Sequence, residues 1–313
     1  MAKEAENVMK RIIENVEKVI IGKRYSIELS MISLLCRGHV LIEDVPGTGK
    51  TSLAAALAKS LSCSFQRIQF TPDIMPSDVV GFSMFSPKTQ EFEYHRGVIF
   101  NNILLVDEIN RTSPKTQSSL LEAMEEKQVS VDGVTYKLDE PFMVLATQNP
   151  VENFGVYPLP EAQMDRFLMR ISLGYPNFKE ESSMITRFNA KSPLATLTPV
   201  ASVADVLGMQ RAVEQIYVDE KINDYVVALV THTRNNEFVA LGASPRASIN
   251  LCKAAQAWAL YNQRNYVLPD DVIKMSPHVL SHRIMLKQES KLKKITQVNI
   301  VEMALNGTKV PSA

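Results

Sequence analysis

Cysteine is scarce in this sequence, and no two cysteines are spaced for a cross-link. Cys36, Cys63 and Cys252 are odd in number, far apart and outside any Cys-x-x-Cys pair. This pattern argues against a disulfide framework and against a zinc knuckle. A reducing compartment suits these thiols best, so we expect a cytoplasmic protein.

Long apolar runs and an excess of charge of one sign are also lacking. No run approaches the ~18 apolar residues of a membrane span, and the charged N-terminus has no apolar segment of the kind that directs export. The 34 basic residues balance the 34 acidic ones, so no overall field attracts nucleic acid or an anionic membrane. We therefore expect no membrane insertion, and a nucleic-acid partner is disfavoured.

Two kinds of periodicity divide the 313 residues, a length that suits two domains. Up to about residue 178, short apolar runs alternate with helical stretches. This predicts an α/β fold whose mostly parallel sheet is covered on both faces. The expected strands are 40–42, 65–70, 103–106, 142–146 and 167–173.

After residue 178 the apolar spacing becomes helical. The expected helices are 179–189, 202–216, 219–234, 245–260 and 269–280. A proline-containing stretch, 191–200, is the expected linker. We therefore predict an α/β domain over residues 1–190 and an all-helical domain over residues 200–313.

A glycine-rich loop follows the first expected strand and leads into a helical stretch. Such a loop lets backbone N–H groups approach phosphate oxygens, while a helix N-terminus, a lysine and a hydroxyl complete the contacts with phosphate and Mg²⁺. Gly47, Gly49, Lys50 and Thr51 supply these parts, although Asp44 stands where the general pattern has glycine. The sequence predicts binding of ATP with Mg²⁺. The expected contacts are Asp44, Val45, Pro46, Gly47, Thr48, Gly49, Lys50, Thr51 and Ser52, with Thr51 also a metal ligand.

An acidic pair ends a later strand, because Ile103 to Val106 run directly into Asp107 and Glu108. Ligands of open α/β sheets bind at the carboxyl ends of the strands. Asp107 would hold Mg²⁺ through a water molecule, and Glu108 would orient and deprotonate the water that attacks the γ-phosphate. An isolated Asp-Glu pair is usually a solvated loop, but a buried strand behind it and a phosphate loop upstream favour catalysis.

Four further segments occur in a fixed order after the glycine-rich loop. They read LVDEINR at 105–111, LLEAMEE at 120–126, ATQNP at 146–150 and LPEAQMDRF at 159–167. Together with residues 43–51 they resemble the MoxR family of AAA+ ATPases, over about residues 20 to 285. In that family an aspartate occupies the position of Asp44. The resemblance implies an AAA+ αβα core, a helical lid and hydrolysis of ATP.

The resemblance also implies roles for residues outside these two motifs. Asn149 matches sensor 1, a polar side chain near the γ-phosphate, although Asn-Pro is also a common turn signal. Arg166 matches the arginine finger that reaches a neighbouring subunit's ATP, the alternative being an ion pair with Glu161 or Asp165.

Sensor 2 of the family corresponds to Arg246, in a lid that closes on the nucleotide. A positive charge at a helix start is unfavourable unless an anion is near, which favours a phosphate partner. Ile21 and Gly22 complete the nucleotide contacts that the resemblance implies.

Two segments alternate as hairpins do, at 82–98 and, around Asp132-Gly133, at 128–138. They resemble the helix 2 insert and the pre-sensor 1 hairpin, elements that can project towards a central pore or a partner. The alternative is an inert surface hairpin in each place.

The function implied by the resemblance is that of a chaperone-like motor. Family members commonly form hexameric rings, remodel or mature protein clients or insert cofactors, and often act with von Willebrand factor A domain proteins. A nucleic-acid or chelatase-type motor shares both inserts and is the first alternative. A nucleotide-gated scaffold with little turnover is the second, although a scaffold would not need Glu108.

Overall fold

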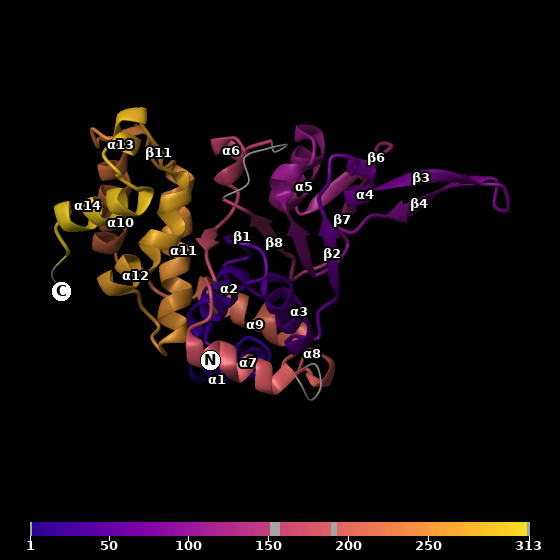
Figure 1. Ribbon diagram of the computed structural model, residues 1–313, viewed down its shortest axis with the longest axis horizontal. Coiled ribbons are helices and arrows are strands. Elements are labelled where there is room, and N and C mark those ends of the chain that lie inside the picture. Colours follow the sequence, from indigo (N-terminus) through magenta and orange to yellow (C-terminus); the bar gives the residue numbers. More distant parts are fainter. Residues whose placement is uncertain (1, 151–156, 189–192, 312–313) are drawn as a thin grey trace.

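A five-stranded parallel sheet forms the centre of the first part of the chain (Figure 1). The computed structural model describes residues 2–150, 157–188 and 193–311. The strands are β1 (Val40–Glu43), β2 (Phe65–Gln69), β5 (Ile103–Asp107), β8 (Met143–Gln148) and β9 (Met169–Ile171). They lie in the order β2-β5-β8-β1-β9, and every pairing is parallel. All five carboxyl ends therefore meet at one edge, and the predicted α/β class is confirmed.

Both faces of the sheet are buried, which explains the unbroken apolar runs. In β5, Ile103 and Leu105 join a core with helices α1 (Ala2–Glu17), α2 (Arg24–Leu35) and α3 (Lys50–Ser60). Leu104 and Val106 join a second core on the other face. That face is covered by α4 (Pro76–Val80) and α5 (Pro114–Glu126).

Both segments expected as hairpins are antiparallel pairs. β3 (Gly81–Ser86) pairs with β4 (Glu91–Arg96), and this hairpin extends well beyond the sheet (Figure 1). β6 (Gln128–Val131) pairs with β7 (Val134–Lys137), and positive φ angles of 51° and 78° at Asp132 and Gly133 make the turn between them. Stacking of Tyr94 on Tyr136, with ring centroids 4.1 Å apart, holds the two hairpins together.

The second part of the chain is a helical lid built around α11 (Pro245–Tyr261). The other elements from α9 onwards are α9 (Val203–Glu214), α10 (Glu220–Arg234), α12 (Pro269–Leu280), α13 (Gln288–Leu292), α14 (Gln297–Gly307), a 3-10 helix (Ser281–Arg283) and strands β10 (Val239–Leu241) and β11 (Met285–Leu286). The antiparallel pair β10–β11 departs from the expected all-helical composition. Strands of two or three residues are too short to show alternation in a sequence.

The expected linker is packed on the α/β part rather than free. It holds the short helix α8 (Pro193–Thr196), and the N–H groups of Val200 and Ala201 donate to the carbonyl of Ser60 at 3.0 and 3.1 Å. Asn15 Nδ2 donates to the carbonyl of Thr198 at 2.9 Å. Helix α9 packs on α1 and α2 as well as on α11. The division at residues 190–200 stays a prediction.

No helix in the described ranges is both long enough and apolar enough to cross a bilayer.

A buried histidine joins the start of β1 to α5 and β8. The Val144 N–H donates to His39 Nδ1 at 2.9 Å, and His39 Nε2 lies 3.0 Å from the Met124 carbonyl. This pair of contacts fits the neutral imidazole with its proton on Nε2. Burial, helped by the positive charges of Lys127 and Arg246, lowers the pKa of His39 to about 4.

The lowered pKa of His39 makes the fold sensitive to acid. The unfolded chain binds this proton near pH 6.5 and the folded chain near pH 4, so stability is complete above pH 6.5 and falls as the pH drops through that window. We expect His39→Gln, whose amide does not titrate, to remove about 2 kcal/mol of the stability loss between pH 7 and pH 5. Urea unfolding at pH 7 and pH 5 measures the loss of unfolding free energy between the two. An equal loss in the variant and in the wild type would contradict a lowered pKa of His39 as its cause.

Candidate active site

A polar cavity of about 360 Å³ lies at the carboxyl edge of the sheet. It is lined by Pro46, Gly47, Gly49, Lys50, Thr51, Ser52, Arg67, Gln69, Asp107, Glu108, Thr147 and Asn149. Nine of these twelve are residues that the sequence predicted for the site. Arg67, Gln69 and Thr147 are the three it missed.

The loop between β1 and α3 has the backbone that a phosphate cradle needs. Gly47 and Gly49 have φ angles of 85° and 92°, in the left-handed region that side chains rarely adopt. Helix α3 begins at Lys50, so its unpaired N–H groups face the cavity. Lys50 Nζ spans the loop and donates to the carbonyls of Asp44 and Val45 at 2.9 and 3.3 Å. These groups form a ready site for an anion.

The side chain of Asp44 points away from the cavity, so the nucleotide contact expected of this residue stays a prediction. Its carboxylate is buried and does not line the cavity. Oδ2 accepts the N–H groups of Leu173 and Gly174 at 2.6 and 2.8 Å and the hydroxyl of Ser172 at 3.2 Å, and Oδ1 accepts the N–H of Val45 at 3.0 Å. A buried carboxylate needs such donors. Asp44 therefore ties the loop to the segment after β9.

Four other residues expected to contact the nucleotide lie near the cavity but do not line it. They are Ile21, Gly22, Val45 and Thr48. Thr48 Oγ1 donates to the carbonyl of Val45 at 3.3 Å, so both stabilise the loop from within. Ile21 and Gly22 follow Ile20. The Cδ1 atom of Ile20 lies 3.9 Å from the point that a Cβ atom would occupy if Gly49 carried a side chain. The turn at residues 20–22 thus adjoins the loop from the side of α1 and α2.

Asp107 ends β5 inside a short chain of hydrogen bonds. Arg67 Nε donates to its Oδ2 at 2.6 Å, and the Thr147 hydroxyl donates to its Oδ1 at 3.2 Å. The Thr147 oxygen in turn accepts the N–H of Glu108 at 2.9 Å. The carboxylate is therefore held in one orientation by two neighbouring strands. Arg67 and Gln69 are polar residues in a strand of the central sheet. Their polarity is the sequence signal that could have placed them in the site.

Glu108 has a strained backbone, with φ 57° and ψ 52°. A left-handed conformation costs a residue with a side chain on the order of 1–3 kcal/mol, and such strain clusters at functional sites. Arg111 Nε lies 3.0 Å from Glu108 Oε2, an ion-pair distance, although no N–H in the described residues is aligned for a hydrogen bond with this buried oxygen. Glu108 is thus held at the cavity with an accepting oxygen available. Asn149, directly after β8, lines the same cavity.

Arg166 and Arg246 lie elsewhere, and they lie together. Arg166 Nε is 3.1 Å from Glu125 Oε2, and Arg246 Nη1 is 2.8 Å from Glu125 Oε1. Both arginines line a cavity of about 140 Å³ shared with Gly38 and His39, which precede β1. This cavity is therefore at the amino end of β1, whereas the phosphate loop is at its carboxyl end.

Two observations bear on the roles expected of these arginines, which stay predictions. Arg246 lines the cavity at the amino end of β1 and not the cavity at its carboxyl end, because α11 starts beside the amino end. The ion pair of Arg166 is with Glu125 rather than with Glu161 or Asp165. Asp165 is already engaged, since it accepts the hydroxyl of Ser244 at 2.9 Å and Arg283 Nε at 2.6 Å.

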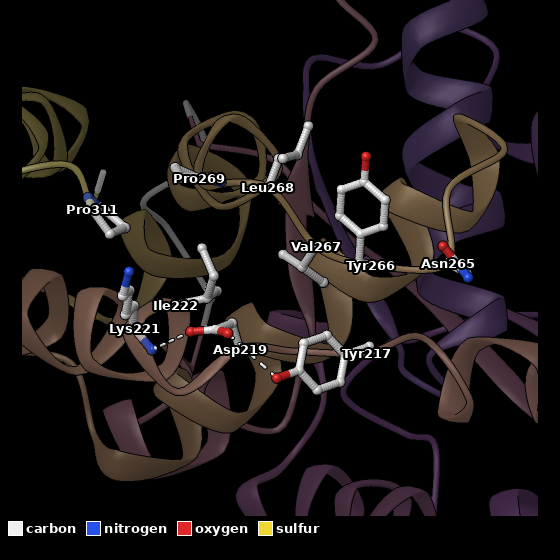
Figure 2. Close-up of a pocket in the computed structure, with 10 residues that line it drawn as sticks. All are labelled: Tyr217, Asp219, Lys221, Ile222, Asn265, Tyr266, Val267, Leu268, Pro269 and Pro311. Atoms are coloured by element: carbon white, nitrogen blue, oxygen red, sulfur yellow. Dashed lines mark hydrogen bonds between the residues drawn. The ribbon is translucent and has the colours of Figure 1, made fainter. Parts of the chain in front are cut away.

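A second cavity, larger than that of the phosphate loop at about 620 Å³, lies in the lid and has none of this chemistry. Figure 2 shows side chains of its wall, among them Tyr217, Tyr266 and Leu268. Its one carboxylate, on Asp219, caps α10 by accepting the Lys221 N–H at 3.0 Å. Size alone therefore does not mark the active site.

The glycine-rich cradle, the acidic pair behind it and the parallel sheet beneath define a P-loop nucleoside triphosphatase. Comparison with known families narrows this class. Residues 39–169 match the ATPase family associated with various cellular activities (AAA), and residues 231–303 match the AAA lid domain.

Relatives of this chain are similar over nearly its whole length. The uncharacterized protein YeaC of Bacillus subtilis is 52% identical over 96% of this chain and 94% of its own. Chaperone MoxR1 of Mycobacterium tuberculosis is 40% identical over 97% of this chain and 83% of its own. A crystal structure of a putative ATPase from Cytophaga hutchinsonii, 39% identical, superposes with a TM-score of 0.92 over 99% of this chain and 97% of that one. The chain belongs to the MoxR family of AAA ATPases.

Proposed function

We propose that the protein hydrolyses ATP with Mg²⁺ in a ring of subunits and uses the cycle to remodel or mature a protein client. The observation that carries the ring is the separation of Arg166 and Arg246 from their own phosphate loop. Two arginines of an ATPase that cannot reach their own nucleotide can serve the nucleotide of a neighbour. A head-to-tail interface forms a ring when the rotation between subunits closes, and a hexameric ring is the form expected of the family.

The donor set of the cavity fits MgATP. The hydroxyl of Thr51 and the carboxylate of Asp107 are hard oxygen ligands, as Mg²⁺ requires, and would hold the ion there. Bound Mg²⁺ would neutralise charge on the β- and γ-phosphates. Lys50 would bind the same phosphates, Glu108 would take the proton of the attacking water, and Asn149 would orient that water.

The client is proposed to be a protein because of the β3–β4 hairpin. Phe82, Met84, Phe85 and Phe92 are all exposed on it, Phe92 by 75%. Apolar side chains on a projecting element mark a surface for protein contact. The name of the relative Chaperone MoxR1 supports the same role. A von Willebrand factor A domain protein or another protein client is the kind of partner that the family resemblance implies.

The rate of ATP hydrolysis per subunit tests the shared active site. We expect this rate to rise with protein concentration to a plateau, in step with assembly followed by light scattering, and to vanish when EDTA removes Mg²⁺. The rise is expected because a lone subunit lacks the arginines of its neighbour. A rate per subunit that stays constant across the assembly range would contradict a shared site and require a monomeric enzyme.

A further inference from the structure

We infer that Glu125 is a positioning residue that holds Arg166 and Arg246 as one set of donors for the nucleotide of the neighbouring subunit. The inference rests on the proposed shared site and adds the carboxylate that orders its arginines. Glu125 lies in the last turn of α5, within the segment 120–126 that contributes to the family resemblance.

The geometry assigns one carboxylate oxygen to each arginine. Oε2 lies 3.1 Å from Arg166 Nε and Oε1 lies 2.8 Å from Arg246 Nη1. The two guanidinium groups come from distant parts of the chain, one just before β9 and the other at the start of α11. A single carboxylate between them fixes their spacing.

The contacts leave most donors of both arginines available. Glu125 meets Arg166 through Nε, and in the part of the chain that the structure describes no hydrogen bond to protein uses its Nη groups. Arg246 meets the carboxylate through Nη1 alone. Since a guanidinium has five N–H donors, each arginine can bind a phosphate oxygen while Glu125 still holds it. The carboxylate therefore orders the pair without competing for all of its donors.

Charge explains why the arrangement needs an acid. Arg37, Lys127 and Lys253 line the same small cavity as the two arginines. Glu140 lies 3.4 Å from both Arg37 and Lys127, so those two cations have a separate partner. Without the carboxylate of Glu125, the like charges of Arg166 and Arg246 would repel each other and separate.

The backbone beneath the arginines is fixed independently of Glu125. Asp165, next to Arg166, accepts the hydroxyl of Ser244, two residues before Arg246, and also pairs with Arg283. Loss of the Glu125 charge should therefore alter the guanidinium positions and leave the fold intact.

The test compares Glu125→Gln with the matched control Glu126→Gln, an exposed neighbour that pairs with neither arginine among the described residues. We expect Glu125→Gln to lower kcat about 10- to 100-fold, the effect of misplacing a transition-state group, with ring assembly and the affinity for ATP unchanged. The control should keep the wild-type rate. Wild-type turnover by Glu125→Gln would overturn the inference.

Mixed rings separate a role towards the neighbour from a role within the subunit. Glu125→Gln mixed with an equal amount of Glu108→Gln should regain about a quarter of the wild-type rate, because that fraction of interfaces joins an intact Glu108 to intact arginines. Glu125→Gln mixed with Arg166→Ala should regain nothing. If Arg166→Ala complements Glu108→Gln but Glu125→Gln does not, Glu125 acts within its own subunit and the inference fails. If neither complements, the shared site itself is wrong.

Discussion

Arg166→Ala is expected to lower ATP turnover by about 10³- to 10⁵-fold, the range that an arginine finger contributes to phosphoryl transfer. The physical reason is that negative charge is spread over the three outer oxygens of the γ-phosphoryl group in the transition state, where a fork of N–H donors from the next subunit would stabilise it. Steady-state hydrolysis at a protein concentration where the wild type is fully assembled measures the effect.

Folding should be unaffected by this change, which keeps the result interpretable. The side chain of Arg166 is 28% exposed and its ion pair is with Glu125, which is 37% exposed. Pairs of this kind contribute about 0–1 kcal/mol to stability. A thermal melt close to that of the wild type is the control.

Complementation decides where Arg166 acts. Arg166→Ala mixed with an equal amount of Glu108→Gln should recover about a quarter of the wild-type rate, because each site draws Glu108 from one subunit and the arginine from the next. Arg246→Ala should behave in the same way, since Arg246 meets Arg166 at Glu125 rather than at its own phosphate loop. If the mixtures are no more active than the single variants, each arginine would act on the ATP of its own subunit.

The sheet and the phosphate loop could be predicted because they depend on local patterns. Strands buried on both faces need unbroken apolar runs, and the cradle needs glycine at Gly47 and Gly49, where φ is 85° and 92°. Asp107 and Glu108 could be placed beside that cradle because the carboxyl ends of parallel strands share one edge.

The arginines and Asp44 could not be placed in this way, because their partners are distant in the chain. Arg246 meets Glu125 across 121 residues, and Asp44 meets Gly174 across 130. Such contacts depend on how the lid and the segment after β9 pack on the core. A motif can indicate that an arginine takes part in ATP hydrolysis. Only the packing of the lid and of the segment after β9 on the core shows at which end of the sheet the arginine lies.

Glu108→Gln is expected to lower turnover about 10²- to 10⁴-fold while ATP binding and assembly stay near wild type, because an amide cannot take the proton of the attacking water. The change is nearly isosteric and keeps the left-handed backbone at φ 57°, whose N–H donates to Thr147. Single-turnover hydrolysis and binding of a fluorescent ATP analogue separate the two effects.

Asp107→Asn is expected to give the opposite pattern and serves as the matched comparison. Its loss of charge should weaken binding of MgATP, because Asp107 is a proposed ligand of the ion and its carboxylate also pairs with Arg67 at 2.6 Å. Adjacent acids at one strand end would then divide into a binding role and a catalytic role. Glu108→Gln with a wild-type rate, or Asp107→Asn with wild-type affinity for MgATP, would remove that division and the mechanism built on it.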